Sequence, residues 1–329
     1  MILAGDIGGT KVNLAVFEET NGRLEKREER KFESRGYPGL VEILDEYLQG
    51  KSLSLSAACF GVAGPVKDGK CQVTNLPWNL DVVALKTRLG LDAVWLINDL
   101  AAMAASVPFL EADELECLQP GIEEEGRIAV LAAGTGLGQA FLVPDPSGRY
   151  LILDSEGGHA DFAPRNEQEA DLLRFSLRHW DRVSVERILS GPGLVHLYRF
   201  FLERTNLAEP PWIVEQFKNE DRGAVVTRNA LGKRFPPCEQ ALDLFVSLYG
   251  AVAGNLALQV MTRGGVYVGG GIAPQIISAL KGGVFQEAFV AKGRFRPFLE
   301  QIPVRVIFND KAALLGAARY AQGEKFVRN

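Results

Sequence analysis

Short apolar runs alternate with amphipathic stretches along the first third of the chain, and the period of the apolar positions predicts strands and helices. Val12, Leu14 and Val16 recur at every second position, which is typical of a strand, and Asn21-Gly22 is typical of the turn that follows. The pattern predicts strands at residues 2–6, 11–18, 23–34 and 93–97, and a strand that runs into a Gly/Pro loop within 53–66. It predicts helices at 37–50, 80–90 and 98–107. These elements predict a mixed sheet flanked by helices.

A second unit begins near Glu111, where the pattern starts again with two apolar strands at 127–134 and 139–144. A mainly helical region follows from about Glu167 to Met261, with two proline pairs as breaks. A strand then enters the Gly-rich turn at 264–274, and a late strand is predicted at 303–309. The last helix is predicted at 310–323, with Asp310 as its N-cap.

One plan occurs twice along the chain. ILAGDIGGTKVNLAVFE and IAVLAAGTGLGQAFLVP both consist of an apolar strand, a Gly-rich turn with a threonine, and a second apolar strand. A repeated unit of this kind predicts two related halves that face each other.

Composition limits the class of protein and its partners. The chain has 329 residues, 47% hydrophobic and 23% charged, which is ordinary for about two globular domains. Its 36 basic and 41 acidic residues give a net charge of −5, which argues against a nucleic acid or an anionic membrane as partner.

The four cysteines (Cys59, Cys71, Cys117 and Cys238) lie far apart and form no zinc-binding spacing with the histidines. We therefore expect reduced, structural thiols and a cytoplasmic protein without zinc. The start MILAGDIGG reaches a glycine turn too early for a signal peptide. No apolar run approaches the roughly 20 residues that a membrane span needs.

Three Gly-rich turns are candidates for binding phosphate, because glycine lets backbone amides approach an anion closely. They are GDIGGTK at 5–11, AGTGLG at 133–138 and GGGI at 269–272. None has the spacing of a P-loop or a convincing dinucleotide fingerprint. Asp6 directly precedes the first turn, and a carboxylate beside a phosphate predicts Mg²⁺ between them, held through water; the alternative is an Asx turn.

Polar residues in apolar or glycine-rich surroundings are the candidates for binding a substrate. Asn98 and Asp99 stand between a strand and a helix, where ligands collect in α/β folds, although both residue types also cap helices. SEGGHADF places Glu156 and His159 on one turn, which is a weak metal signal and equally consistent with ordinary turn residues. Glu186 by itself is typical of a solvated helix surface.

The motifs DIGGTK, LINDL, AGTGLG, EGGHADFAP, ERILSGPGLVHLY, NLAL and GGGIAP, taken in order, resemble the bacterial glucokinases of the hexokinase/actin-like superfamily. The resemblance runs from Ile2 to about Tyr320. It implies an α/β, two-domain actin-like (ribonuclease H-like) ATPase fold with sugar and ATP in a cleft. The small domain would comprise residues 1–109 plus 300–321, and the large domain residues 110–299.

The resemblance also assigns residues to roles. It implies ATP-binding motifs at Asp6, Gly8, Gly9, Thr10, Gly134, Thr135, Gly136, Gly269, Gly270 and Gly271. It implies sugar contacts from Asn98, Asp99, Glu156, His159 and Glu186, with Asp99 as the catalytic base.

The implied reaction moves the γ-phosphoryl group of ATP to the 6-hydroxyl of D-glucose, with Mg²⁺, in a cytoplasmic homodimer at the entry to glycolysis. The related ROK proteins often carry a clustered cysteine motif for zinc after the E-G-G-H segment, whereas this chain has no cysteine there until Cys238. Two alternatives stay open at this point: a kinase for mannose, fructose or an N-acetylhexosamine, and a non-catalytic sugar-sensing regulator.

Overall fold

The computed structural model describes residues 1–20 and 23–327, so the predicted turn at Asn21-Gly22 lies outside the described residues. The chain forms two compact units. Unit 1 comprises Met1–Glu114, Ala140–Asp154 and Asn309–Asn329, and unit 2 comprises Leu115–Gln139 and Ser155–Phe308. Mixed sheets flanked by helices confirm the predicted α/β class.

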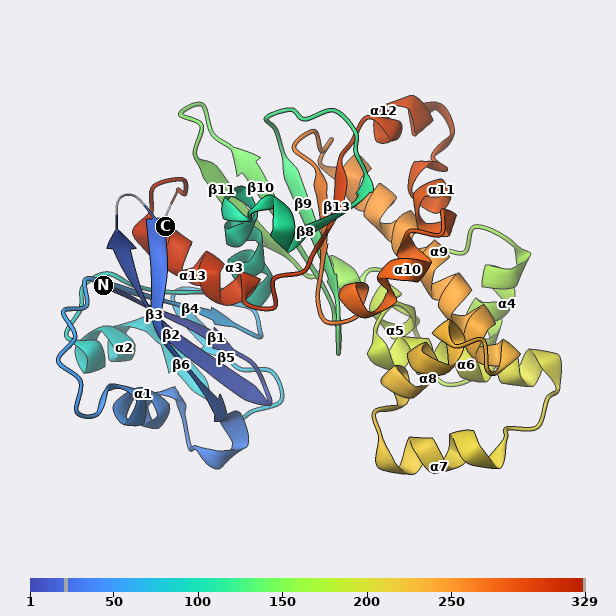
Figure 1. Cartoon of the computed structure of the whole chain (residues 1–329), viewed down its shortest axis with the longest axis horizontal. Coiled ribbons are helices and arrows are strands. Elements are labelled where there is room, and N and C mark those ends of the chain that lie inside the picture. Colours follow the sequence, from blue (N-terminus) through green and yellow to red (C-terminus); the bar gives the residue numbers. More distant parts are fainter. Residues whose placement is uncertain (21–22, 328–329) are drawn as a thin grey trace. The chain divides into compact units, whose positions relative to one another are not determined.

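Unit 1 is built on a five-stranded sheet in the order β3-β2-β1-β4-β7 (Figure 1). Its strands are β1 (Ile2–Ile7), β2 (Lys11–Thr20), β3 (Arg23–Glu33), β4 (Ala57–Val62) and β7 (Val94–Asn98). β2 is antiparallel to β1 and β3, whereas β1, β4 and β7 run parallel to one another. The parallel part of the sheet therefore brings three strand ends to one edge.

Helices cover both faces of this sheet. They are α1 (Leu40–Leu48), α2 (Val82–Leu89), α3 (Asp99–Ser106) and α13 (Ala312–Gln322), beside a small hairpin of β5 (Lys70–Gln72) and β6 (Asn79–Asp81). Leu3, Leu14 and Phe60 belong to the same core cluster as Ile43 of α1. On the other face the rings of Trp95 and Tyr320 meet edge to face, 6.3 Å apart.

The close approach of α13 to α3 depends on a glycine. A Cβ on Gly316 would overlap the carbonyl oxygen of Ala102 and would lie 2.8 Å from the backbone nitrogen of Ser106. The closing helix is thereby held against α3, the helix that begins at Asp99. The final helix of the chain is thus part of the unit that contains the N-terminus.

The observed units differ from the expected division at 1–109, 110–299 and 300–321. Unit 1 extends to Glu114 and includes the segment Ala140–Asp154. Its C-terminal part begins at Asn309. The inserted segment joins unit 1 because Tyr150 pairs with the C-terminal segment: its N–H donates to Lys325 at 2.7 Å, and its carbonyl accepts from Val327 at 3.0 Å.

Unit 2 contains β8 (Leu115–Gln119), β9 (Ile128–Ala133), β12 (Val266–Gly269) and β13 (Val304–Ile307). β12 is parallel to β9 and β13, and β8 is antiparallel to β13. β10 (Leu137–Pro144) leaves this unit after Gln139, and β11 (Tyr150–Ser155) follows it. The sequence pattern did not predict β8 or β11.

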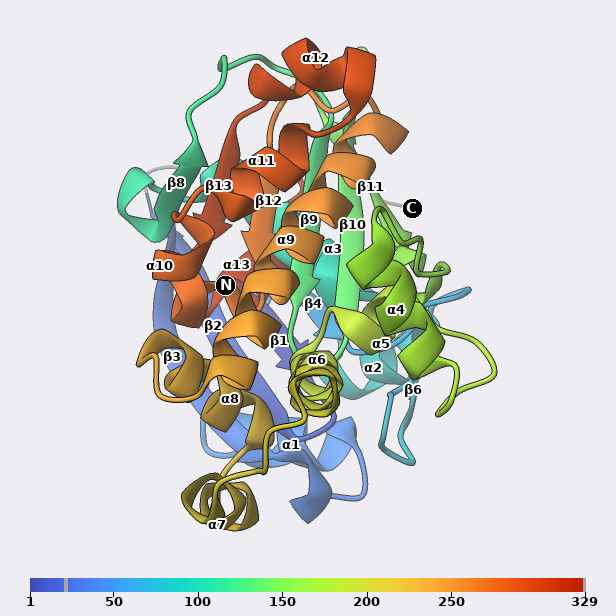
Figure 2. The same cartoon turned by 90° about the vertical axis from the view of Figure 1, so that its right-hand side faces the viewer.

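The helices of unit 2 surround one long central helix, α9 (Pro236–Gln259), which Figure 2 shows running along strands β9 and β12. The others are α4 (Glu167–Ser176), α5 (Val185–Ile188), α6 (Gly191–Thr205), α7 (Pro211–Asn219), α8 (Arg222–Leu231), α10 (Ile277–Leu280), α11 (Val284–Val290) and α12 (Arg296–Glu300).

α9 corrects the expectation that no apolar run approaches the length of a membrane span. Its 24 residues are long and apolar enough for one, with a mean hydropathy of 1.5 over its most apolar window. However, 72% of that window is buried inside the protein. Burial of this kind is typical of the core helix of a globular unit.

A buried histidine joins α6 to α4. His196 is 6% exposed and shares a 2.8 Å hydrogen bond with Ser176. Burial lowers the pKa of His196 to about 4, and the charges of His179 and Arg199 act in the same direction. His196 is therefore neutral in the folded protein at neutral pH.

We expect Gly316→Ala to lower the free energy of unfolding by about 2 kcal/mol, because the added Cβ forces α13 away from α3. Urea unfolding monitored by circular dichroism measures this. Gly36→Ala is the matched control, since a Cβ at Gly36 meets nothing within 4 Å. Equal stability of the two variants would contradict this account of the packing.

We expect stability to fall with pH between about 6.5 and 4, because the unfolded chain protonates His196 there while the folded protein does not. The contribution of neutral His196 to the free energy of unfolding is fully present above the pKa of His196 in the unfolded chain, about 6.5. It is lost as the pH falls through the pKa in the folded protein, about 4. His196 should contribute a loss of about 2 kcal/mol between pH 7.5 and 5.0. Urea unfolding of the wild type and His196→Gln at both pH values measures it: the variant should show the smaller loss.

Candidate active site in two parts

The predicted residues of unit 1 gather at the carboxyl edge of its parallel strands. Ile7 at the end of β1 lies opposite Val62 at the end of β4, and Val62 lies opposite Asn98 at the end of β7. The first glycine turn follows β1, the segment 63–66 follows β4, and Asp99, the first residue of α3, directly follows β7. This is the edge at which ligands collect in sheets of this type.

Asn98 caps α3, as one interpretation of the sequence predicted. Its side-chain oxygen accepts from the N–H of Leu100 at 2.9 Å and of Ala101 at 3.4 Å. Its amide nitrogen donates to the carbonyl of Gly64 at 3.2 Å. One amide hydrogen remains for a further bond, because the group carries two.

Asp99 is the first residue of α3 and is partly exposed, so the pair stands at the rim of the core. Its Oδ1 accepts from the N–H of Leu100 at 2.9 Å. The N-terminus of a helix also favours a negative charge. Burial, together with the Asp99 carboxylate, raises the pKa of the Cys71 thiol on β5.

Asp6 lies next to the turn, on the sheet face that carries α3 and α13. Asn13, which lies opposite Asp6 on β2, donates to Asp6 Oδ2 at 3.3 Å. Burial raises the pKa of the Asp6 carboxyl, while that hydrogen bond and the charge of Lys311 lower it. Asn13 Oδ1 is buried without a hydrogen-bond partner. This leaves oxygen donors of the kind that a hard cation prefers.

The first glycine turn is held by hydrogen bonds to β2 and to the residue that follows β3. The N–H of Gly8 donates to the carbonyl of Lys11 at 2.9 Å, and the Gly8 carbonyl accepts from the Ser34 hydroxyl at 2.8 Å. A Cβ on Gly9 would lie 2.8 Å from the carbonyl oxygen of Thr74. Thr10 is exposed, so its hydroxyl is available to a ligand.

The loop after β4 lies beside the segment 74–78. The Thr74 N–H donates to the Ala63 carbonyl at 2.8 Å. Pro65 and residues 72–77 line a hollow of about 500 Å³ on unit 1.

The predicted residues of unit 2 gather around the turn between β9 and β10. The turn closes on itself, since the Gly134 N–H donates to the Gly136 carbonyl at 2.9 Å. Glu186 Oε2 accepts from the N–H of Leu137 at 2.9 Å. Glu186 therefore supports the second glycine turn, and its side chain is 31% exposed, unlike the solvated glutamate that composition alone favours.

His159 stands between two carboxylates. Its Nε2 lies 3.7 Å from Glu156 Oε2, and its Nδ1 lies 4.0 Å from Glu186 Oε1. The side chains of His159 and Glu156 are 56% and 67% exposed. The structure thus brings together all three residues that sequence reasoning assigned to sugar binding in this half of the chain.

The glycines of the E-G-G-H segment explain how the three side chains meet. A Cβ on Gly158 would overlap the carbonyl oxygen of Leu137, and one on Gly157 would overlap the side-chain amide of Gln139. The turn η4 (Gly157–His159) therefore lies directly against β10. Gln139, which is 5% exposed and which sequence reasoning did not single out, forms the floor of this turn.

The third glycine turn begins at the end of β12. Gly270 has φ +82°, and a Cβ there would overlap the Ala133 carbonyl, so the turn needs glycine for both reasons. Gly271 accepts from the side chain of Gln275 at 2.8 Å and has open space where a Cβ would lie. β9 and β12 are parallel neighbours, so their two turns leave the same edge of the sheet.

A cavity of about 1370 Å³ in unit 2 joins these turns. Its lining includes Gly134, Thr135, His159, Glu186 and Gly271. The remainder of the wall comes mainly from residues 179–199, residues 217–223 and Gln275. The second and third glycine turns, His159 and Glu186 therefore face one cavity, whereas Glu156 is not among its lining residues.

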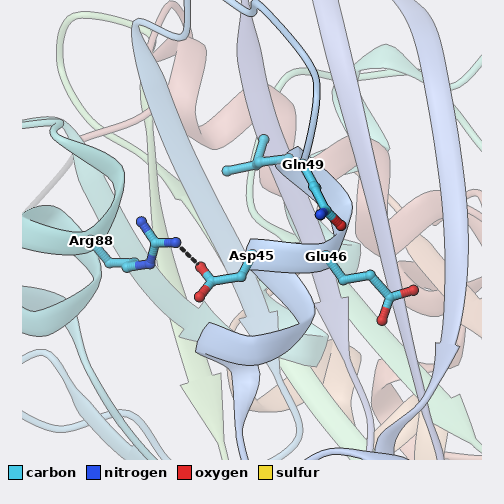
Figure 3. A pocket seen from close by; sticks show the side chains of 5 residues that line it. Asp45, Glu46, Gln49 and Arg88 are labelled. Atoms are coloured by element: carbon cyan, nitrogen blue, oxygen red, sulfur yellow. Dashed lines mark ion pairs between the residues drawn. The ribbon is translucent and has the colours of Figure 1, made fainter.

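A second hollow of unit 1, between α1 and α2, holds none of the predicted residues (Figure 3). It is lined by Asp45, Glu46, Leu48, Gln49 and Arg88 and has a volume of about 550 Å³. Arg88 forms an ion pair with Asp45, and Glu46 accepts from the Tyr37 hydroxyl. Glu46 also forms an ion pair with Arg30, so the charged groups of this hollow have partners and we assign it no ligand.

Among the described residues no group of three or more His, Cys, Asp and Glu side chains could hold a metal ion. All four cysteines are free, and only Cys117 is exposed. A cation at Asp6 would therefore take most of its ligands from water and from phosphate oxygens.

Comparison with known proteins gives one consistent result. The Glucokinase family model matches residues 3–324. The chain is 42% identical over 334 residues to the glucokinase of Nostoc punctiforme, with 97% of this chain and 98% of that protein covered. A glucokinase crystal structure from an Antarctic psychrotroph aligns with a TM-score of 0.87 at 31% identity, covering 98% of this chain and 99% of that one.

More distant structures share the fold. A ROK family glucokinase from Streptomyces griseus, solved with glucose and AMPPNP, aligns with a TM-score of 0.63 at 22% identity, covering 98% of this chain and 99% of that one. With the family model and the Nostoc relative spanning almost the whole length, the chain belongs to the glucokinase family.

Proposed function

We infer that this chain transfers the γ-phosphoryl group of ATP to the 6-hydroxyl of D-glucose, giving ADP and glucose 6-phosphate. One observation carries the inference within a single unit. Glu186 lies 4.0 Å from His159 and also accepts from the backbone of Leu137, which follows the second phosphate turn. The Glu186 carboxylate therefore lies beside His159, which is proposed to bind sugar hydroxyls, and also supports the backbone after the turn that is proposed to bind phosphate.

Asp99 is the proposed general base. It accepts the proton of the 6-hydroxyl as that oxygen forms its bond to the γ-phosphorus and the bond to the ADP oxygen breaks. Phosphoryl transfer depends mainly on positioning and charge stabilisation. The hydrogen bond from Leu100 and the start of α3 fix the carboxylate for this role.

Asn98, Glu156, His159 and Glu186 are proposed to bind the sugar hydroxyls. Carboxylates accept from hydroxyls, and the spare amide hydrogen of Asn98 can donate to one. A hexose lacking a matching hydroxyl would leave such a group without its partner, which provides discrimination. The Streptomyces griseus protein, which was solved with glucose, shares this fold.

The three glycine turns are proposed to bind ATP. Asp6, Gly8, Gly9 and Thr10 form the first phosphate site, with Gly134, Thr135 and Gly136 as the second and Gly269, Gly270 and Gly271 beside the adenosine. Mg²⁺ would be held by Asp6 through water and would neutralise phosphate charge. The buried carboxylate and the unpartnered Asn13 oxygen fit such an ion.

We further propose a cytoplasmic homodimer without zinc that acts on small molecules, with neither nucleic acid nor a membrane as partner. The net charge of −5 supports the absence of polyanionic partners. The burial of α9 supports its role as a core helix.

Asp99→Asn should lower kcat roughly 10²- to 10⁴-fold while glucose binding is retained, because the amide keeps the acceptor for Leu100 but cannot take the proton. Coupled ADP release measures kcat, and calorimetry measures glucose binding. Asp81→Asn is the matched control, since Asp81 also accepts from a backbone N–H at the start of a helix, that of Val83 in α2. Near-normal turnover by Asp99→Asn would overturn the assignment, and a panel of hexoses in the same assay tests the preference for glucose.

Glu156→Gln and Glu186→Gln should each raise KM for glucose about tenfold, because each weakens hydrogen bonds to a charged acceptor. Glu186→Gln should also raise KM for ATP, since it weakens the bond that supports the turn at Leu137. Steady-state kinetics with each substrate varied separates the two effects. Glu167→Gln, at an exposed position of α4, serves as control. Unchanged KM for glucose in both variants would contradict the sugar site.

A further inference from the structure

Tyr249 lies in the middle of α9, and its hydroxyl joins the ends of two strands. The N–H of Ala133, the last residue of β9, donates to the hydroxyl oxygen at 3.1 Å. The hydroxyl in turn donates to the carbonyl of Gly269, the last residue of β12, at 3.3 Å. The side chain is fully buried.

Both strand ends lead directly into the turns that face the large cavity of unit 2. Gly134 and Thr135 follow Ala133, and Gly271 follows Gly269 by two residues; all three line the cavity. Ala133 is also the residue against which Gly270 packs. The hydroxyl therefore connects the two strand ends from which the turns at Gly134 and Gly270 begin.

The ring of Tyr249 is itself held in place. Phe245 and Phe285 meet it edge to face, with ring centres 5.8 Å and 6.0 Å away. Burial raises the pKa of the phenol, so it keeps its proton and can donate at any physiological pH. A fixed ring with a neutral hydroxyl forms a rigid link between α9 and the two strands.

We propose that Tyr249 is a positioning residue for the nucleotide: by bonding Ala133 and Gly269 it fixes the distance between the second phosphate turn and the adenosine turn. This rests on the proposed function for the identity of the ligand. Tyr249 touches no substrate, and it acts through the backbone of the two turns. Sugar binding, which depends on Glu156, His159 and Glu186, does not pass through it.

The test is Tyr249→Phe, which keeps the ring and removes the hydroxyl. We expect KM for ATP to rise at least about fivefold, because the hydrogen bonds of the hydroxyl to Ala133 and to Gly269 are lost together, with KM for glucose unchanged. The dissociation constant of AMPPNP, measured by calorimetry, should rise by the same factor. Because that binding needs no turnover, it still tests the proposal if the chain does not phosphorylate glucose.

Tyr198→Phe is the matched control. Tyr198 is a buried tyrosine of the same unit whose hydroxyl donates to Glu209 at 2.8 Å and does not line the cavity. It should lower the melting temperature without changing KM for ATP. The proposal is overturned if Tyr249→Phe leaves AMPPNP binding unchanged, or if both variants raise KM for ATP and for glucose alike.

A second variant tests the same link from the other side. Gly270→Ala disturbs the contact with Ala133 and requires an unfavourable backbone conformation, so it should also weaken AMPPNP binding. Because both changes act on one spacing, their combined effect should be smaller than the product of the single effects. Independent, multiplicative effects in the double variant would overturn the proposal.

Discussion

Parallel strands that end at a common edge are the constraint on which the rest of the structure depends. In unit 1 they bring the turn after β1, the loop after β4 and the Asn-Asp pair after β7 together. In unit 2 they bring together the turns after β9 and β12. Residues far apart in the chain become neighbours for this reason alone, and the glycines then let the turns approach without a Cβ between them.

The polar residues at these edges are stabilised by backbone groups. A carboxylate or amide among apolar residues is costly unless it is hydrogen-bonded. Asn98 and Asp99 accept from the first N–H groups of α3, and Glu186 accepts from Leu137. Asp6 is the least satisfied of these groups: burial raises the pKa of its carboxyl, and its neighbour Asn13 keeps an unpartnered oxygen. That contrast is why a cation is proposed at Asp6 and at none of the others.

Sequence reasoning succeeded where a local pattern determines the structure. The alternation in 11–18, the cap at Asn98 and the glycine turns are all local, and the structure shows each of them. It failed where tertiary contacts decide. Asp310 was predicted to cap the last helix, but the helix begins at Ala312 and Asn309 accepts from Lys311 instead. β8 has no clear period of its own and is a strand because it pairs with β13. Tyr249 had no sequence signal, since a tyrosine in an apolar helix is typical of any core.

Glu186 links the proposed sugar-binding and phosphate-binding residues of unit 2. One of its oxygens supports the backbone at the phosphate turn, and the other faces His159. In the proposed role, a sugar hydroxyl that donates to the second oxygen would alter the charge available to the first, because both belong to one delocalised carboxylate. Tyr249 supports the same turn from the opposite side, through Ala133, without contacting the sugar-binding side chains. The turn after β9 is therefore held both by Glu186, through Leu137, and by Tyr249, through Ala133; of these two residues only Glu186 has a proposed contact with the sugar.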